Sequence, residues 1–316
     1  MKHAATTDLA RLSGEIIQAG SKSFAAASRL FDPKTRISAH LLYAWCRHCD
    51  DVIDGQELGF AAGTAGGHDP KTELAKLRQQ TADALAGKAM REPVFQAFQA
   101  VMRKHDIPAR YAYELLDGFA MDVEGRPYAS IDDTLSYCYH VAGVVGVMMA
   151  MIMGVRDDGT LDRACDLGLG FQLTNIARDI VDDAAVGRCY LPERWLTEAG
   201  LTRTNFADPG KRSDLFGVAR RLLETAETYY ASSSFGISQL PLRSGWAIAT
   251  ARNVYREIGR EVLRRGPDAW AARVSTSTAQ KIRAAGVGGA IAVDARLRGR
   301  LIASRPRTGL WTRPKG

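Results

Sequence analysis

Apolar residues recur every three to four positions along almost the whole chain, which is the period of an amphipathic α-helix. Stretches in which β-branched and polar residues alternate, as they do in half-buried strands, are missing from the sequence. The pattern predicts an all-α fold with helices over about 8–19, 35–54, 71–87, 93–105, 108–124, 131–154, 158–184, 213–234, 244–265 and 275–299.

Turn-forming residues separate the predicted helices. Pro33, Pro93 and Pro108 stand near helix starts, where the missing N–H of proline does no harm. Residues 61–70 carry several glycines, and Asp208-Pro209-Gly210 marks another turn. No segment is long and rich enough in Pro, Gly and Ser to resemble an interdomain linker. We therefore expect one domain over 1–299, followed by a tail over 300–316.

Composition narrows the class of protein. The chain has 316 residues, of which 46% are hydrophobic and 24% charged, as in soluble globular proteins. Five cysteines are too few, and odd in number, for a disulfide framework, which favours a reducing cytoplasm. The first residues lack the apolar core of a secretory signal. The longest apolar run, 141–155, is shorter than the ~20 residues that span a bilayer.

Basic residues are concentrated at the C-terminal end. Residues 283–316 hold eight Lys and Arg against Asp294 alone, which accounts for the whole net charge of +7. The balanced remainder argues against a broad nucleic-acid-binding face. Two interpretations of the tail stay open: a solvated, flexible end, or a segment attracted to an anionic membrane surface, which would place the protein at the inner face of the membrane.

The first candidate site is an acidic helix face. Tyr43, Arg47, Asp50 and Asp54 fall within about 60° of one another on the predicted helix. Asp50 and Asp54 are four residues apart, so their carboxylates are neighbours and repel unless a cation lies between them.

A second helix repeats this arrangement. Gly168, Gln172, Asn175, Asp179 and Asp183 share one face of a segment that is otherwise rich in apolar residues. Polar side chains in such a segment need partners.

Two acidic faces of this kind favour a divalent metal. Carboxylate and amide oxygens suit Mg²⁺, which keeps waters and commonly bridges to substrate phosphates; Mn²⁺ is the alternative ion. Arg47 and Arg178 lie close to the acids and are suited to holding phosphate oxygens. A single Asp-x3-Asp would be taken as a solvated helix face, but two copies with an arginine each favour a site.

Other motifs carry less weight. Cys46-Arg-His-Cys49 has the spacing of a redox or zinc site, but it has no second pair and lies within a predicted helix. Gly168-Leu-Gly170 begins like a dinucleotide-binding loop, but no third glycine follows.

Taken together, these residues make the chain similar to the squalene/phytoene synthase family, and to its bacterial phytoene-forming branch. Six motifs in order carry the resemblance: Ser21-Lys-Ser-Phe24, Tyr43-x2-Cys-Arg47-x2-Asp50-Asp-x2-Asp54, Tyr137-Cys-Tyr139-His-Val-Ala-Gly143-Val-Val-Gly146, Gly168-x3-Gln172-x2-Asn175-Ile-x-Arg178-Asp179-x3-Asp183, Gly187-Arg188-Cys-Tyr190-Leu-Pro192 and Tyr255-Arg256.

The resemblance implies an isoprenoid-synthase helical bundle around a central hydrophobic cavity. It implies Mg²⁺-dependent head-to-head condensation of two geranylgeranyl diphosphates to phytoene through a cyclopropyl intermediate, without NADPH. It also allows association with other carotenoid-pathway enzymes.

The implied roles fall into three groups. The metal ligands would be Asp50, Asp54, Asn175, Asp179 and Asp183. The diphosphates would be held by Arg47, Arg178 and Arg188, with Ser21, Tyr43, Tyr190 and Tyr255 as hydroxyl partners. Gly168 and Gln172 would also contact substrate, and the aromatic rings of Phe24, Tyr139 and Phe171 would shield the allylic cation.

Three alternatives stay open. Dehydrosqualene and squalene synthases share the mechanism but use farnesyl diphosphate, and squalene synthases also use NADPH. A terpene cyclase or head-to-tail prenyl synthase would explain the acids but not the surrounding motifs. A non-catalytic helical assembly factor would explain neither.

Overall fold

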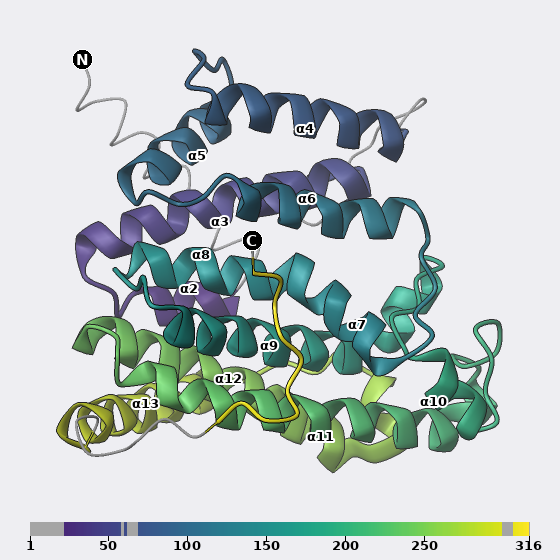
Figure 1. Ribbon diagram of the computed structural model, residues 1–316. Coiled ribbons are helices and arrows are strands. Elements are labelled where there is room, and N and C mark those ends of the chain that lie inside the picture. Colours follow the sequence, from purple (N-terminus) through teal and green to yellow (C-terminus); the bar gives the residue numbers. More distant parts are fainter. Residues whose placement is uncertain (1–21, 58–59, 62–68, 299–305, 316) are drawn as a thin grey trace.

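The computed structural model describes residues 22–57, 60–61, 69–298 and 306–315 (Figure 1). The N-terminal elements are α2 (Lys22–Ser28), α3 (Pro33–Asp54), a two-residue hairpin of β1 (Gln56–Glu57) and β2 (Phe60–Ala61), α4 (Pro70–Leu85), α5 (Pro93–Lys104) and α6 (Arg110–Val123). The two strands pair antiparallel, with Gln56 opposite Ala61.

The chain continues with α7 (Ile131–Cys138), a π-helical turn η1 (Tyr139–Gly143), α8 (Val144–Ile152) and α9 (Asp158–Ala185). After these come α10 (Glu193–Glu198), η2 (Pro209–Lys211), α11 (Arg212–Ile237), α12 (Leu242–Arg265), η3 (Gly266–Trp270) and α13 (Thr278–Arg298). The predicted all-α fold class is confirmed. The helix predicted over 8–19 lies outside the described residues, and short α2 and α10 were missed.

Local sequence explains where the long helices begin and end. The Asp32 carboxylate caps α3 by accepting from the backbone N–H groups of Lys34 and Thr35, and Pro33 takes the first helical position. The same helix ends at Gly55, whose φ of 62° only glycine adopts without strain. Ser130 and Asp133 form a capping box at the start of α7.

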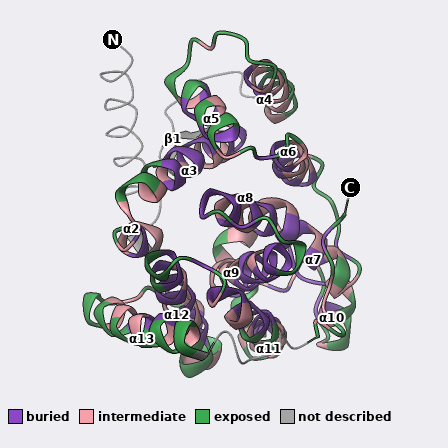
Figure 2. Cartoon of the chain, turned by 60° about the vertical axis from the view of Figure 1, so that its left-hand side comes forward, coloured by how far each residue is buried: buried purple, intermediate pink, exposed green. Residues whose placement is uncertain are grey.

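Helix α9 is the centre of the bundle. Figure 2 shows α8 and α9 inside a ring formed by the other helices, with α9 largely buried. Fifteen of its 28 residues are buried, although it carries the second predicted acidic face. Because α9 contacts η1, α8, α11 and α12, its position fixes where the second acidic face lies.

Glycines bring α9 into backbone contact with η1 and α8. A Cβ on Gly168 would lie 2.5 Å from the carbonyl oxygen of Ala142, and one on Gly146 would lie 2.5 Å from that of Ala164. Both distances are too short for real atoms, so the contact requires glycine on each side. Gly168 therefore serves helix packing, and its contact with substrate stays a prediction.

The segment from Ile131 to Ile152 has the length and hydropathy of a membrane-spanning helix. In the fold, 61% of its most apolar window is buried, against α6 and α9 among others. We interpret it as a core helix.

The C-terminal segment is docked onto the bundle. In Figure 1 it runs across α11 and α9. The Arg307 guanidinium donates to both carboxylate oxygens of Asp166, a residue with no exposed surface, through Nε at 2.9 Å and a terminal nitrogen at 2.5 Å. Arg313, only 2% exposed, donates to Asp158 and Asp162 at 2.7 Å each. The expected flexible, solvated tail is therefore wrong for residues 306–315, because acids at i, i+4 and i+8 of α9 pair with its arginines.

This docking predicts a large effect of a single tail substitution. Arg307→Met should lower the free energy of unfolding by about 3–5 kcal/mol, because it leaves the buried Asp166 carboxylate without its cation. The midpoint of urea unfolding measures this. The control is Arg264→Met, which removes an exposed ion pair to Glu261 and should leave the urea midpoint nearly unchanged. Equal effects of the two substitutions would contradict docking.

Candidate functional site: two acidic helix faces joined by Arg188

The first acidic face lies on α3. Arg47 forms ion pairs with Asp50 at 3.1 Å and with Asp51 at 2.6 Å. Its Nε atom is buried and has no hydrogen-bond partner among the described residues. One turn further on, Asp54 lies at the end of the helix. The face therefore carries three carboxylates, of which Arg47 compensates two.

The second acidic face lies on α9. Arg178 donates through Nε to Asp179 at 2.8 Å and through a terminal nitrogen to the second oxygen of the same carboxylate. Arg273, which follows η3, reaches the same acid at 3.4 Å. The side-chain amide of Asn175 donates to Gln172 at 3.3 Å, and its buried carbonyl oxygen has no donor in the part of the chain that the structure describes.

Arg188 joins the two faces. It lies in the loop that follows α9, after Gly187, whose φ is 79°. Its guanidinium donates to both oxygens of Asp54 on α3, the longer bond being 3.4 Å. Burial and the charge of Asp179 raise the pKa of Asp183 on α9, and the positive charge of Arg188 opposes that rise, so the loop holds a cation between the two acidic helices.

Asp122 on α6 is a further acid of the site that sequence analysis missed. It accepts hydrogen bonds from the hydroxyls of Tyr137 at 3.1 Å and Tyr190 at 2.9 Å. These two rings stack with centroids 4.5 Å apart. Burial raises the pKa of Asp122, and the negative charge of Asp54 adds to that rise, so the two acids lie near one another. Asp122 lies outside the predicted motifs and has no second acid three or four residues away. The sequence pattern therefore did not indicate it as a site residue.

Crowding leaves these acids reluctant to ionise. Burial, then the charge of Asp54, raises the pKa of Asp50 to about 7. Burial, then the charge of Asp179, raises the pKa of Asp183 to about 7. Burial raises the pKa of Asp122 to about 6. A bound cation would favour the ionised form of all three carboxyls.

Aromatic rings border the acids. The ring of Phe24 on α2 stacks on Tyr43 of α3 with centroids 5.2 Å apart. The ring of Phe171 on α9 stacks on Tyr255 of α12 with centroids 4.1 Å apart. Tyr255 also lies near enough to raise the pKa of Tyr43, after the larger effect of burial. The structure thus brings together aromatic residues from four helices.

The donor set suits a hard divalent cation. Mg²⁺ in phosphate-handling sites is bound by one or two carboxylates plus substrate oxygens and waters. The acids of α3 and α9 and the unpartnered Asn175 oxygen fit that requirement. Among the described residues, no three acidic, His or Cys side chains form a ready-made metal cluster. Arg188 on Asp54, and Arg178 and Arg273 on Asp179, hold the predicted ligands in ion pairs instead.

One of the predicted substrate contacts lies elsewhere. Tyr139 is fully buried, donates to Glu114 and lies 5.3 Å from the Trp311 ring, on the side of the docked C-terminal segment. Its predicted role as an aromatic shield is corrected, and Tyr137 faces the acids instead. Tyr190 reaches the site, but its hydroxyl is already bound to Asp122. Ser21 lies outside the described residues.

The raised pKa of Asp183 predicts a pH-dependent stability effect. The folded protein holds a proton that the unfolded chain has lost between about pH 4 and 7, so this group makes folding less favourable as pH rises across that window. In EDTA, Asp183→Asn should raise the melting temperature at pH 8 more than at pH 4.5. Asp182→Asn, an exposed neighbour, is the control and should show a much smaller trend, because burial and Asp179 raise the pKa of Asp183 more than Asp182 does. A melting temperature of Asp183→Asn that tracks the wild type at every pH would contradict the crowded site.

Comparison with known proteins agrees with this geometry. The chain is 56% identical over 301 residues to a 15-cis-phytoene synthase from Pantoea ananas, covering 95% of this chain and 96% of that one. It is 58% identical over 299 residues to a 15-cis-phytoene synthase from Enterobacter agglomerans, covering 94% of this chain and all of that one. A dehydrosqualene synthase crystallised with a ligand superposes with a TM-score of 0.81 at 25% identity, covering 92% of this chain and 98% of that one.

The sequence profile of the squalene/phytoene synthase family matches residues 17–280. This range includes both acidic faces, Arg188 and Tyr255. The chain therefore belongs to the squalene/phytoene synthase family.

Proposed function

We propose that this protein is a phytoene synthase, which condenses two molecules of geranylgeranyl diphosphate head to head and releases diphosphate. The observation that carries the proposal is the pair of acidic faces on α3 and α9, opposed across Arg188. The bacterial relatives at 56% and 58% identity are named for the same product.

The residues of the site match the demands of the reaction. An allylic diphosphate ionises only when the departing negative charge is neutralised. Arg47, Arg178 and Arg188 each have guanidinium groups beside the acids, from which a diphosphate could draw charge-assisted hydrogen bonds. The divalent cation, proposed as Mg²⁺ with Mn²⁺ as an alternative, would act as the Lewis acid that balances the diphosphate charge.

The carbocation that remains must be kept from water. The stacked pairs Phe24–Tyr43 and Phe171–Tyr255 place aromatic faces beside the acids. Such faces attract a cation without reacting with it and exclude water from its neighbourhood. In this proposal the acidic faces and their arginines bind the diphosphates, and the bordering aromatic rings shield the carbocation.

The direct test is a product assay. Purified protein with geranylgeranyl diphosphate and Mg²⁺, without NADPH, should yield a C40 hydrocarbon with a conjugated triene. Asp50→Asn should lower turnover by at least about 100-fold, because the leaving charge loses a stabilising partner, while circular dichroism stays unchanged.

Asp182→Asn, one residue from Asp183 but exposed, is the matched control and should keep its turnover. A parallel reaction with farnesyl diphosphate separates the alternatives. A C30 product formed from the shorter substrate alone would move the enzyme to dehydrosqualene synthesis. Full activity of Asp50→Asn would contradict the proposed site.

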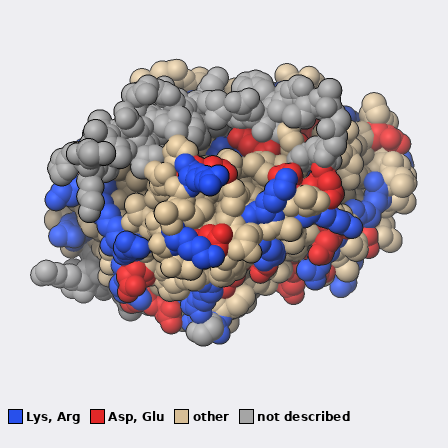
Figure 3. Space-filling view, turned by 90° about the horizontal axis from the view of Figure 1, so that it is seen from above, with Lys and Arg blue, Asp and Glu red and all other residues tan. Residues whose placement is uncertain are grey.

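We also propose that the protein is cytoplasmic and binds the inner face of the membrane through α13. Arg307 and Arg313 of the tail are already paired with acids of α9. The exposed side chains of α13 are therefore better candidates for membrane contact. Ile282, Val293 and Leu297 are 68%, 49% and 74% exposed. Their positions fall on one face of the helix, with basic residues on its flanks. On the surface shown in Figure 3, by comparison, Lys and Arg lie among Asp and Glu, which does not favour nucleic acid.

Vesicle sedimentation tests this contact. Leu297→Glu should reduce binding to vesicles containing phosphatidylglycerol several-fold, because it removes an apolar anchor and adds repulsion. Leu242→Glu is the control, since Leu242 is 47% exposed at the start of α12. Equal binding by the wild type and Leu297→Glu would contradict contact through α13.

A further inference from the structure

A pocket of about 330 Å³ opens between α12 and α13, apart from the acidic site. This volume lies at the lower end of the range for small-molecule sites. Tyr255, on the same helix, packs instead against Phe171 of α9. The residues that line the pocket are Arg252, Asn253, Arg256, Glu257 and Arg260 from α12, and Gln280, Arg283, Ala284, Val287 and Ile291 from α13.

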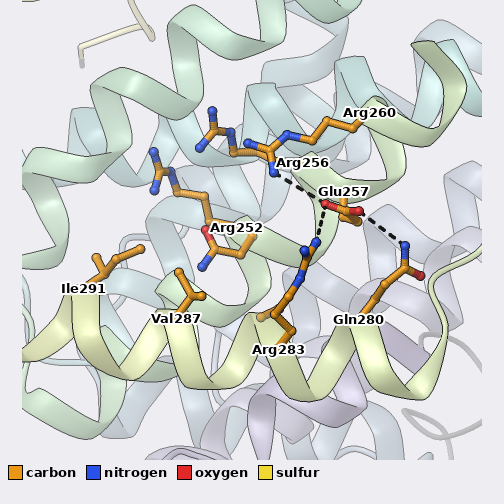
Figure 4. A pocket seen from close by; sticks show the side chains of 10 residues that line it. Arg252, Arg256, Glu257, Arg260, Gln280, Arg283, Val287 and Ile291 are labelled. Carbon is orange, nitrogen blue, oxygen red and sulfur yellow. Dashed lines mark hydrogen bonds and ion pairs between the residues drawn. The ribbon is translucent and has the colours of Figure 1, made fainter. Parts of the chain in front are cut away.

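Positive charge exceeds negative charge in this pocket. Four arginines line it, and Glu257 is the only acid among the lining residues. Three side chains contact the Glu257 carboxylate at long distances: guanidinium nitrogens of Arg260 and Arg283 at 3.4 and 3.3 Å, and the Gln280 amide nitrogen at 3.3 Å. Figure 4 shows these three side chains converging on the one carboxylate. All three distances exceed that of a strong charge-assisted hydrogen bond.

The excess of positive charge includes a buried arginine, Arg252. It is only 8% exposed, and its Nε donates to the backbone carbonyl of Tyr230 at 2.9 Å. Among the described residues it forms no ion pair, whereas Arg256, one turn away, is held by Glu227. Burial, then the charge of Arg256, lowers the pKa of Arg252 to about 10. Glu227 is near enough to offset part of this effect but is itself bound to Arg256. A buried guanidinium with no direct ion pair among the described residues is a strong candidate for an external anion.

A second lining residue is also unsatisfied. The side-chain nitrogen of Asn253 is buried and lacks an acceptor among the described residues. On the α13 side, beyond Gln280 and Arg283, the wall is apolar and is formed by Ala284, Val287 and Ile291. The pocket thus offers several N–H donors on one side and a hydrocarbon surface on the other.

We propose that this pocket is a second anion site, which binds a phosphate or diphosphate group. Arg252, Arg260 and Arg283 would hold the oxygens, and Glu257 would be displaced from its long ion pairs. The same chemistry is offered by free diphosphate and by the headgroup of an anionic lipid, whose chain would lie on Val287 and Ile291. The proposal is independent of the reaction catalysed at the acidic site.

Calorimetric titration of the full-length protein tests the site. EDTA is present throughout, so that metal-dependent binding at the acidic faces is suppressed. Inorganic diphosphate is one probe and monomeric dihexanoylphosphatidic acid is the other. Arg260→Met/Arg283→Met should weaken binding of the preferred probe at least about tenfold, since two charge-assisted donors are lost. Both side chains are more than half exposed, so folding should be unaffected.

Two further variants sharpen the result. Arg264→Met, one turn beyond Arg260 and also more than half exposed but outside the pocket, should bind as the wild type does. Glu257→Gln should bind more tightly, because it removes the internal competitor. Tighter binding of the lipid than of diphosphate would identify a headgroup site, and the reverse a site for the free anion. Binding of neither probe, or binding that the double variant leaves unchanged, would overturn the proposal.

Discussion

The structure depends on holding carboxylates close together where they are costly to ionise. Asp50 and Asp54 on α3, Asp122 on α6 and Asp183 on α9 influence one another's charge, and Arg188 is the cation placed between them. Left alone, such a cluster weakens the fold. It becomes favourable when a divalent metal supplies the missing positive charge and bridges the carboxylates to an anionic substrate. A site that is poorly stable when empty and well stabilised when full is suited to drawing a diphosphate away from carbon.

The rest of the bundle stabilises this arrangement by fixing the position of α9. Gly146 and Gly168 let α9 touch η1 and α8 backbone to backbone, so the helix cannot shift without a clash. On another side, Arg307 and Arg313 pair with the acids at the N-terminal half of the same helix. The two constraints act upstream of Asn175, Asp179 and Asp183. The anchored N-terminal half of α9 therefore fixes the position of the C-terminal half, which carries the acidic face.

Much of this could be predicted from sequence, for identifiable reasons. Helical periodicity gave the long helices and the shared faces of Asp50 with Asp54 and of Asp179 with Asp183. Tyr137 and Tyr139 were harder to tell apart: two residues apart on a helix, they point in nearly opposite directions, and only the position of Glu114 and Trp311 decides which one faces away. Asp122 became visible only once α6 was placed beside α3 and α7. The tail was misjudged because counting its charge ignored Asp158, Asp162 and Asp166, whose spacing matches one face of α9.

The central claim is that a divalent cation completes the acidic cluster, and proton release tests it most directly. Mg²⁺ is titrated into the protein at pH 7 in buffers of different ionisation enthalpy, which gives the number of protons released per metal bound. Because the pKa of Asp50 and of Asp183 is raised to about 7 in the metal-free protein, binding at this pH should release protons. The release should shrink at pH 8.5 and in Asp50→Asn. Metal binding with no proton release at pH 7 would contradict the account.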